Sequence, residues 1–451
     1  MLKDITVKDI LDCTNGRLIY GNINDVCINF STDTRTIQEN DVFIGIKGET
    51  FDGNLFYKDA FDKGAKVCIV NNLIDEDVIE GKTLILVDDT IKALGQIAKC
   101  KRDMLDIPVV AVTGSVGKTS TRNIITSILS QKYKVLSTAG NFNNNIGLPL
   151  TILKYKDEDI MVLEMGMNAL GEISYLSKIA SPTLAVITNV GTAHIGKLGG
   201  QENILKAKME ITDGLKKDGI LIINNDNTPL HNNLPNITCK YMTIGIDNKS
   251  DVMAEVIEYQ DFSGLFKING VDFKINVGGP GFVYDSLLGY AAGTTLGLTP
   301  NEIKKGIESV KLTSKRMEKM INNNGITIVN DAYNASFDSV ENAITVLNHA
   351  KNPRKIFVFG DILELGEYSK GIHESIADLI LKSNINIVIT VGNDSKYTAN
   401  KLKENGFKEV YEFDKESDTY DFIKNLIKKD DIILFKGSNG IKLFNIVEQI
   451  K

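Results

Sequence analysis

Residues 114–120 bring together the residue types that bind a phosphate group. Two glycines enclose a two-residue loop, and a lysine and two hydroxyl residues follow the second glycine at once. Glycines let backbone N–H groups turn toward an anion, a lysine reaches terminal phosphates, and a neighbouring hydroxyl can face Mg²⁺. The stretch therefore predicts a nucleotide phosphate site made by Gly114, Ser115, Val116, Gly117, Lys118, Thr119 and Ser120.

Three further side chains could complete such a site. Glu164 ends an apolar run and could bind Mg²⁺ beside the loop, although an ordinary carboxylate at the rim of a sheet is the alternative. His194 follows the next apolar run, and a structural histidine is the alternative there. Lys208 falls in a predicted helix over residues 201–215, where a solvated lysine is the alternative.

The elements that must hold these residues can be predicted from the apolar pattern. Residues 109–112, Val-Val-Ala-Val, are typical of a short buried strand. After Lys118, four aliphatic residues recur at helical spacing, at Ile124, Ile125, Ile128 and Leu129. Strand, glycine loop and helix together favour a phosphate loop. The alternative is a plain strand–helix turn with a surface lysine, because the usual loop has four residues between its glycines rather than two.

The composition is that of an ordinary globular protein. The chain has 451 residues, of which 43% are hydrophobic and 24% are charged, and its formal net charge is −7. This charge argues against broad binding to nucleic acid or to a membrane surface. The chain has no apolar run of about 18 residues and no apolar leader, so neither a membrane span nor a signal peptide is predicted. Five scattered cysteines fit a reducing cytoplasm and predict no disulfide or zinc site.

The order of the predicted elements indicates an α/β protein with three domains. Residues 1–86 form a small α/β domain, with strands at 42–46 and 66–70 and a helix at 56–63. Residues 87–313 form a central domain around a parallel sheet with the phosphate loop, and it ends in a β-rich segment at 240–278 and two helices. Residues 314–451 restart as a Rossmann-like domain, with strands at 326–329, 355–359, 387–391, 409–413 and 432–435.

Motifs along nearly the whole chain resemble those of the Mur ligase family. Residues 113–119 (Thr-Gly-Ser-Val-Gly-Lys-Thr) match its short phosphate loop, which accounts for the missing two residues. Two segments, 164–173 and 188–194, are similar to its metal-binding segments, and residues 207–210 match the segment whose lysine is carbamylated in several relatives. The remaining matches are 140–149, 316–318, 330–335, 360–366 and 436–438.

The resemblance implies an N-terminal domain for a UDP-linked substrate, a central ATPase domain, and a C-terminal domain that binds D-alanyl-D-alanine and closes over ATP. The implied reaction is ATP-dependent amide formation in the cytoplasmic stage of peptidoglycan synthesis. ATP phosphorylates the terminal carboxylate of UDP-N-acetylmuramoyl-tripeptide, and the amine of D-alanyl-D-alanine then displaces phosphate. Phosphorylation supplies the leaving group that a free carboxylate lacks. A monomer with no nucleic-acid partner and no membrane insertion is expected.

The resemblance also implies roles for individual residues. Catalysis is assigned to Lys118, Glu164, His194 and Lys208, and Mg²⁺ to Thr119, Glu164, His194 and Lys208 as a carbamate. Arg316 and Asp331 join the phosphate loop in binding ATP. The substrate-binding residues are Thr34, Arg35, Lys47, Asn141, Asn143, Asn144, Tyr333, Asn334, Lys436 and Ser438. Read without the resemblance, the segment around Thr34 and Arg35 favours a plain polar turn over a phosphate-binding loop.

The chain departs from the family pattern where adenine is expected to bind. The family's His-Asn-x-x-Asn is absent, and residues 281–285 read Gly-Phe-Val-Tyr-Asp. Two of these residues could rebuild the contact, because Phe282 could stack on adenine and Asp285 could accept a hydrogen bond from its amino group. Plain core packing is the alternative for Phe282. Ser336-Phe337-Asp338, Asn54 and Asn439 are further departures.

Two rival functions remain open from the sequence. One is a related Mur-type or folylpolyglutamate-type ligase that uses another amine. The other is a nucleotide-dependent switch, since residues 248–251 read Asn-Lys-Ser-Asp, the form of a guanine-reading motif. No Asp-x-x-Gly lies between the phosphate loop and this point, so we expect a polar turn there and disfavour the switch.

Overall fold

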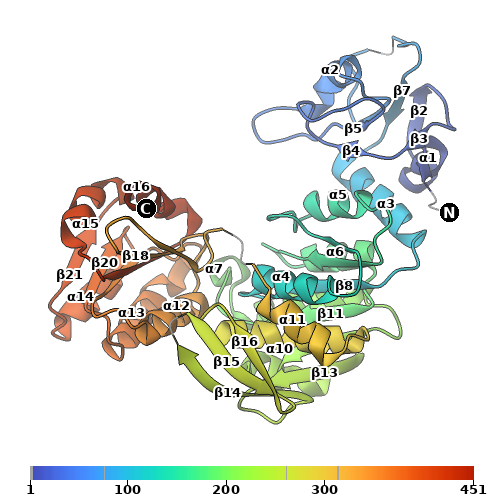
Figure 1. The fold of residues 1–451 in the computed structure, drawn as a ribbon. Coiled ribbons are helices and arrows are strands. Elements are labelled where there is room, and N and C mark those ends of the chain that lie inside the picture. The colour runs from blue at the N-terminus through green and yellow to red at the C-terminus, as the bar shows by residue number, and fades with distance from the viewer. Residues whose placement is uncertain (1–3, 76, 261, 312–313) are drawn as a thin grey trace.

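The structure is a computed structural model and describes residues 4–75, 77–260, 262–311 and 314–451. The described residues form three main sheets, which follow one another along the chain (Figure 1). Each sheet lies within one of the three predicted domain ranges. The exact boundaries stay predictions, and the one at residue 313 lies outside the described residues, as does the start of the chain at residues 1–3.

The N-terminal domain is a small mixed sheet with short helices. Its strand order is β2 (Arg17–Tyr20), β7 (Thr83–Leu86), β6 (Val67–Val70), β5 (Val42–Ile44) and β4 (Phe30–Ser31), parallel except for β2 against β7. A separate pair, β1 (Ile5–Thr6) and β3 (Val26–Cys27), lies beside it. The helices are α1 (Val7–Thr14) and α2 (Tyr57–Asp62). The strands and the helix predicted between residues 42 and 70 are confirmed, and each is slightly shorter than predicted.

The central domain is organised around β8 (Val109–Thr113), which is buried along its whole length. In the strand order β9 (Val135–Ser137), β10 (Ile160–Glu164), β8, β11 (Leu184–Ile187), β12 (Ile220–Asn224) and β13 (Lys240–Gly245), each neighbouring pair is parallel. Because β8 lies between β10 and β11, the segments that follow these three strands leave the same edge of the sheet together. This edge is where Lys118, Glu164 and His194 were predicted to meet.

The β-rich segment extends the same sheet instead of forming a separate one. β14 (Val252–Gln260) begins parallel to β13 and then pairs antiparallel with β15 (Ser263–Ile268), which pairs with β16 (Val271–Ile275). The predicted turn at residues 248–251 is confirmed, since the Asp226 carboxylate accepts hydrogen bonds from the backbone N–H groups of residues 246–248. The helices of this domain are α3 (Thr90–Asp103), α4 (Lys118–Leu129), α5 (Gly147–Leu153), α6 (Glu172–Ala180), α7 (Ile195–Leu198), α8 (Gln201–Met209), α9 (Thr228–Asn233), α10 (Pro280–Thr295) and α11 (Pro300–Glu308).

The helix predicted over residues 201–215 is wrong in its second half. α8 ends at Met209, and residues 210–214 form a 3₁₀ turn. Glu210 explains the change, because its carboxylate accepts hydrogen bonds from the backbone N–H groups of Gly171 at 2.7 Å and Ser174 at 3.2 Å. These donors belong to the start of α6, so a tertiary cap outweighs the local preference for helix.

The C-terminal domain is a parallel sheet with one antiparallel edge strand. Its order is β17 (Glu318–Ile321), β18 (Thr327–Asp331), β22 (Ile432–Lys436), β19 (Lys355–Gly360), β20 (Ile387–Val391) and β21 (Val410–Phe413). The helices are α12 (Phe337–His349), α13 (Ser369–Leu381), α14 (Ser395–Glu404), α15 (Tyr420–Leu426) and α16 (Phe444–Ile450). The five predicted strands are confirmed. None of the helices in the described ranges combines the length and apolar character of a membrane span.

Candidate active site

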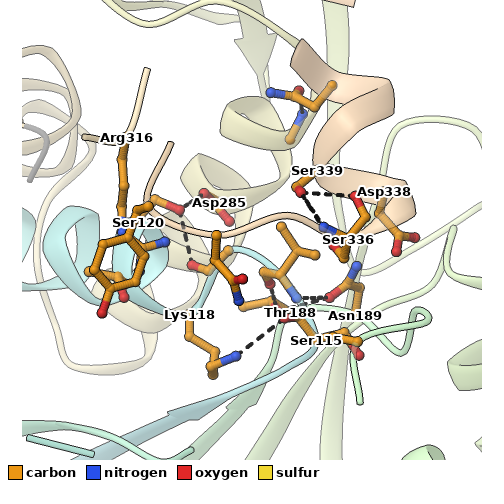
Figure 2. A pocket seen from close by; sticks show the side chains of 18 of the residues that line it. Ser115, Lys118, Ser120, Thr188, Asn189, Asp285, Arg316, Ser336, Asp338 and Ser339 are labelled. Atoms are coloured by element: carbon orange, nitrogen blue, oxygen red, sulfur yellow. Dashed lines mark hydrogen bonds between the residues drawn. The ribbon is translucent and has the colours of Figure 1, made fainter. Parts of the chain in front are cut away.

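A cavity of about 720 Å³ lies where the central and C-terminal domains meet. Its walls come from the ends of β8, β10 and β11, the start of α10, and the segment from Arg316 to Thr345 (Figure 2). The predicted site residues that line it are Ser115, Val116, Gly117, Lys118, Thr119, Ser120, Asn141, Asn143, Asn144, Glu164, His194, Phe282, Asp285, Arg316, Asp331, Tyr333, Asn334 and Lys436.

The phosphate loop is held open by the segment that follows β11. The backbone N–H groups of Ser115 and Val116 donate to the backbone oxygen and the Oδ1 of Asn189, at 3.0 and 2.9 Å. Gly114 and Gly117 have φ of 153° and 82°, a region that side chains other than glycine rarely adopt. The glycine conformations and the start of α4 are typical of an anion cradle, in which Asn189 engages the N–H groups of Ser115 and Val116 in this structure.

Lys118 folds back over this loop. Its ammonium donates to the carbonyl oxygens of Gly114 at 2.8 Å and Ser115 at 3.3 Å (Figure 2). Burial lowers the pKa of Lys118, and the nearby Glu164 carboxylate opposes that shift. Lys118 is half-buried, and an ammonium whose hydrogen-bond partners among the described residues are carbonyl oxygens is well placed to gain from a phosphate group.

Glu164 is buried at the end of β10 and faces α4. Its carboxylate accepts a hydrogen bond from Thr119 Oγ1 at 3.0 Å and from Asn143 Nδ2 at 2.9 Å. Arg122 lies 3.6 Å from the same carboxylate and is itself buried. The structure therefore brings together the hydroxyl and the carboxylate that were predicted to bind Mg²⁺, and both offer oxygen atoms, which Mg²⁺ prefers.

His194 and Lys208 occupy different positions relative to the cavity. His194 lines it, and its Nδ1 lies 2.7 Å from Glu364 Oε2 of the C-terminal domain. Burial and the charge of Lys118 lower the pKa of His194, whereas Glu364 opposes that shift. Lys208 is almost fully buried on α8 outside the cavity lining, and burial holds the pKa of its amine well below the usual value. No hydrogen bond or ion pair engages this amine within the part of the chain that the structure describes.

The C-terminal domain contributes a charged pair and a stacked arginine. Lys436 lies 2.7 Å from Asp331 and donates to the carbonyl oxygen of Asn334 at 2.8 Å. The two residues end the neighbouring strands β18 and β22, in direct register. The Arg316 guanidinium lies 4.2 Å from the centre of the Tyr333 ring, which holds a positive charge at the cavity wall. These contacts place Arg316 and the paired charges of Lys436 and Asp331 on the C-terminal side of the cavity.

Phe282 and Asp285 sit in the first turns of α10. Asp285 receives hydrogen bonds from the hydroxyls of Ser120 (Figure 2) and Thr121, so both of its oxygens are engaged with α4. Burial raises the pKa of Asp285 to about 7. Phe282 is 7% exposed and packs in the main hydrophobic core while also touching the cavity. Adenine recognition by these two residues stays a prediction.

Six of the predicted residues lie outside the cavity lining: Thr34, Arg35, Lys47, Gly114, Lys208 and Ser438. Arg35 is exposed and pairs with Asp33 at 2.7 Å, and Lys47 pairs with Asp52 through a backbone bridge in the same domain. Ser438 accepts a hydrogen bond from the backbone N–H of Leu363 at 2.9 Å. The N-terminal substrate residues thus belong to a separate surface, away from the phosphate loop.

Sequence reasoning missed three polar residues at this site: Arg122, Asp338 and Glu364. Arg122 is buried against Glu164, and its sequence signal was a charged residue on the otherwise apolar face of α4. Asp338 and Glu364 reach the central domain from the C-terminal one. Their local sequence carries no signal for such a contact, because it depends on how the domains dock. Within the described residues, no group of three or more His, Cys, Asp and Glu side chains could hold a metal ion.

Three family models match the chain in order. They are the Mur ligase family catalytic domain over residues 29–102, the Mur ligase middle domain over 112–293, and the Mur ligase glutamate ligase domain over 315–439. Together these models span most of the chain, including every segment that lines the cavity.

Individual proteins are similar over nearly the full length. The UDP-N-acetylmuramoyl-tripeptide–D-alanyl-D-alanine ligase of Bacillus subtilis (strain 168) is 37% identical over 451 residues, covering 99% of this chain and 98% of the relative. A crystal structure of MurF from Acinetobacter baumannii superposes with a TM-score of 0.89 at 28% identity, covering 100% and 99% of the two chains. MurF ligase from Thermotoga maritima, solved in complex with ADP, gives a TM-score of 0.82 at 28% identity, covering 94% and 96%.

Proposed function

The chain belongs to the Mur ligase family, and from this premise we propose that it joins D-alanyl-D-alanine to UDP-N-acetylmuramoyl-tripeptide at the expense of ATP. The observation that carries the proposal is the similarity to ligases of that name over nearly their whole length. The cavity between the central and C-terminal domains supports it, because the phosphate loop and Arg316 both line it.

In the proposed reaction the residues of the phosphate loop bind the terminal phosphates of ATP. Lys118 exchanges its carbonyl partners for phosphate oxygens and stabilises the charge that develops during transfer to the substrate carboxylate. The amine then attacks the acyl phosphate, a C–N bond forms and phosphate leaves. Closure of the C-terminal domain over the cavity would keep water from the acyl phosphate.

Mg²⁺ fits the oxygen donors of this site. Thr119 and Glu164 would hold one ion, which supplies charge neutralisation for the phosphates. His194 and a carbamylated Lys208 are proposed for a second ion. The burial of Lys208 supports the carbamate, because a lowered pKa leaves the neutral amine that reacts with CO₂.

The substrates are proposed to come from the two outer domains. Thr34, Arg35 and Lys47 are proposed to bind the UDP-linked substrate, with the Asn-rich segment at Asn141, Asn143 and Asn144 near the carboxylate to be phosphorylated. Tyr333, Asn334, Lys436 and Ser438 are proposed for the dipeptide side. We further propose a monomeric enzyme of the cytoplasm without a nucleic-acid partner.

Phosphate release with one component omitted at a time tests this proposal. We expect release that requires ATP, UDP-N-acetylmuramoyl-tripeptide and D-alanyl-D-alanine together, assayed with the lysine and the diaminopimelate tripeptides in parallel. Release with another amine in place of the dipeptide would favour the related ligases. Slow hydrolysis that is indifferent to both substrates would favour the nucleotide switch.

A further inference from the structure

A buried carboxylate oxygen at the seam between the two domains has no partner. Asp338 lies in the first turn of α12 and lines the cavity, yet it has no part in the phosphate site described above. Within the described residues its Oδ2 is buried and makes no hydrogen bond, and the nearby Thr192 Oγ1 is in the same condition. Burial raises the pKa of Asp338, while the backbone N–H groups of Thr192 and of Asp338 itself oppose the rise.

In space, a single residue, Gly191, lies between the Asp338 carboxylate and the phosphate loop. Asp338 Oδ2 packs directly against Gly191, where any Cβ would collide with it. The backbone N–H of Gly191 in turn donates to Ser115 Oγ in the loop, at 2.9 Å. An anionic side chain has thus been brought by another domain to the place where the phosphates of ATP are proposed to bind.

The negative charge of the Asp338 carboxylate at this position favours a cationic ligand. A buried carboxylate oxygen without a hydrogen-bond partner is costly, and a neighbouring phosphate adds repulsion. Asp338 and Thr192 offer two oxygen atoms, fewer than the shell of a divalent cation, and the Mg²⁺ beside the phosphates is proposed to lie on Thr119 and Glu164. An ammonium group donates up to three hydrogen bonds. Asp338 Oδ2 and Thr192 Oγ1 are two acceptors that make no hydrogen bond within the described residues.

We propose that Asp338 binds the ammonium group of the incoming nucleophile and positions it beside the phosphate loop. The inference rests on the proposed function, in which an α-amino group is the attacking species. Such an amine is largely protonated in neutral water, so it arrives as a cation. Glycine at position 191 is what allows the carboxylate to lie this close to Ser115.

The proposal is tested by comparing two ligands that differ only in the amine. One is D-alanyl-D-alanine and the other is propionyl-D-alanine, which has the same skeleton without the amino group. Their dissociation constants are measured with UDP-N-acetylmuramoyl-tripeptide and a non-hydrolysable ATP analogue present. We expect the wild-type protein to favour the amine by at least about tenfold, as a charge-assisted contact at an interface allows, and Asp338→Asn to lose this preference.

Glu341→Gln is the matched control. It removes the same charge one turn further along α12, from an exposed side chain at the same cavity wall, and should keep the preference for the amine. If Asp338→Asn keeps the preference, or if both variants lose it equally, the proposal is wrong. A shift in Mg²⁺ dependence without a change in amine preference would also overturn it.

Melting temperature separates binding from a purely structural role. An acidic residue in the first turn of a helix is stabilised by the helix dipole, so a structural Asp338 predicts a lower melting temperature for Asp338→Asn. A carboxylate kept for binding predicts an unchanged or higher one without ligands. If wild type did not bind D-alanyl-D-alanine at all, the proposed function would fail. The Asp338 assignment would then be tested with the amine that wild type accepts and its deaminated form.

Discussion

Lys118 carries the most specific chemical role in the cavity. Its side chain is half-buried and, among the described residues, its ammonium donates to backbone carbonyls, so its removal should cost little stability while depriving the transferring phosphate of its cation. We expect Lys118→Ala to lower kcat at least ~10²-fold with a nearly unchanged melting temperature. Lys134→Ala, at an exposed ion pair with Asp157, is the control and should be silent. Near-normal turnover of Lys118→Ala would remove Lys118 from the mechanism.

Lys208 and Lys206 lie on the same helix, α8, but differ in burial. The Lys208 amine is buried with a lowered pKa, while Lys206 is exposed. We expect Lys208→Ala to be nearly inactive. Small carboxylic acids that occupy the space left by the lysine side chain should partly restore activity, because they replace the oxygen ligands of a carbamate. Lys206→Ala should be active. An intact-mass measurement that finds only the unmodified amine in active enzyme would contradict carbamylation.

Asp285 couples stability to pH in a calculable direction. Its pKa is about 7 in the folded protein against 3.8 when exposed, so between these values the folded protein holds a proton that the unfolded chain has released. Stability is therefore lost as pH rises from about 4 to 7, by roughly 4 kcal/mol at most. Asp285→Asn removes this loss and keeps an acceptor for the hydroxyls of α4. We expect its melting temperature to exceed that of wild type by more at pH 8 than at pH 5, whereas a constant difference would contradict the shift.

At the scale of elements, Phe282 at the start of α10 could either pack in the core or stack on adenine. The ring is 7% exposed within the main core, so packing should dominate its contribution. We expect Phe282→Ala to cost about 3–5 kcal/mol of stability with an unchanged KM for ATP, whereas Phe282→Leu should recover most of the stability. Chemical denaturation and ATP kinetics measure the two effects. A raised KM for ATP with normal stability would instead support stacking on adenine.

The elements that could be predicted are those whose signal is local. The apolar run before Gly114 and the helical spacing after Lys118 define β8 and α4 without reference to the rest of the chain. Glu164 was found because parallel strands bring their carboxyl ends to one edge. The end of α8 could not be predicted, since Glu210 stops the helix by capping α6, a contact set by tertiary packing.

The site residues that could not be predicted depend on docking between distant segments. Asp338 meets Gly191, and Glu364 meets His194, across the seam of the central and C-terminal domains. Glu364 lies in the matching segment 360–366 and Asp338 at a departure from the family pattern, but neither stretch of sequence indicates a contact with the central domain. The resemblance to a family supplied the roles of Arg316 and Asp331, which residue chemistry alone would have left as a cation and an anion in loops.

At the scale of the whole molecule, the proposed reaction is divided among three domains. The central sheet provides the phosphate loop, the C-terminal domain provides Lys436, Arg316 and Asp338, and the N-terminal domain presents the surface that carries Arg35 (Figure 1). No single domain holds both the phosphate site and all the substrate residues. The central claim is that these parts cooperate to phosphorylate a carboxylate before the amide bond forms.

Oxygen transfer tests this claim most directly. The terminal carboxylate of UDP-N-acetylmuramoyl-tripeptide is labelled with ¹⁸O, the ligation is run to completion with ATP and D-alanyl-D-alanine, and the released phosphate is analysed by mass. An acyl phosphate passes one carboxylate oxygen to phosphate when the amine displaces it, so the account predicts labelled phosphate in step with the amide product. Amide product accompanied by unlabelled phosphate would contradict the account.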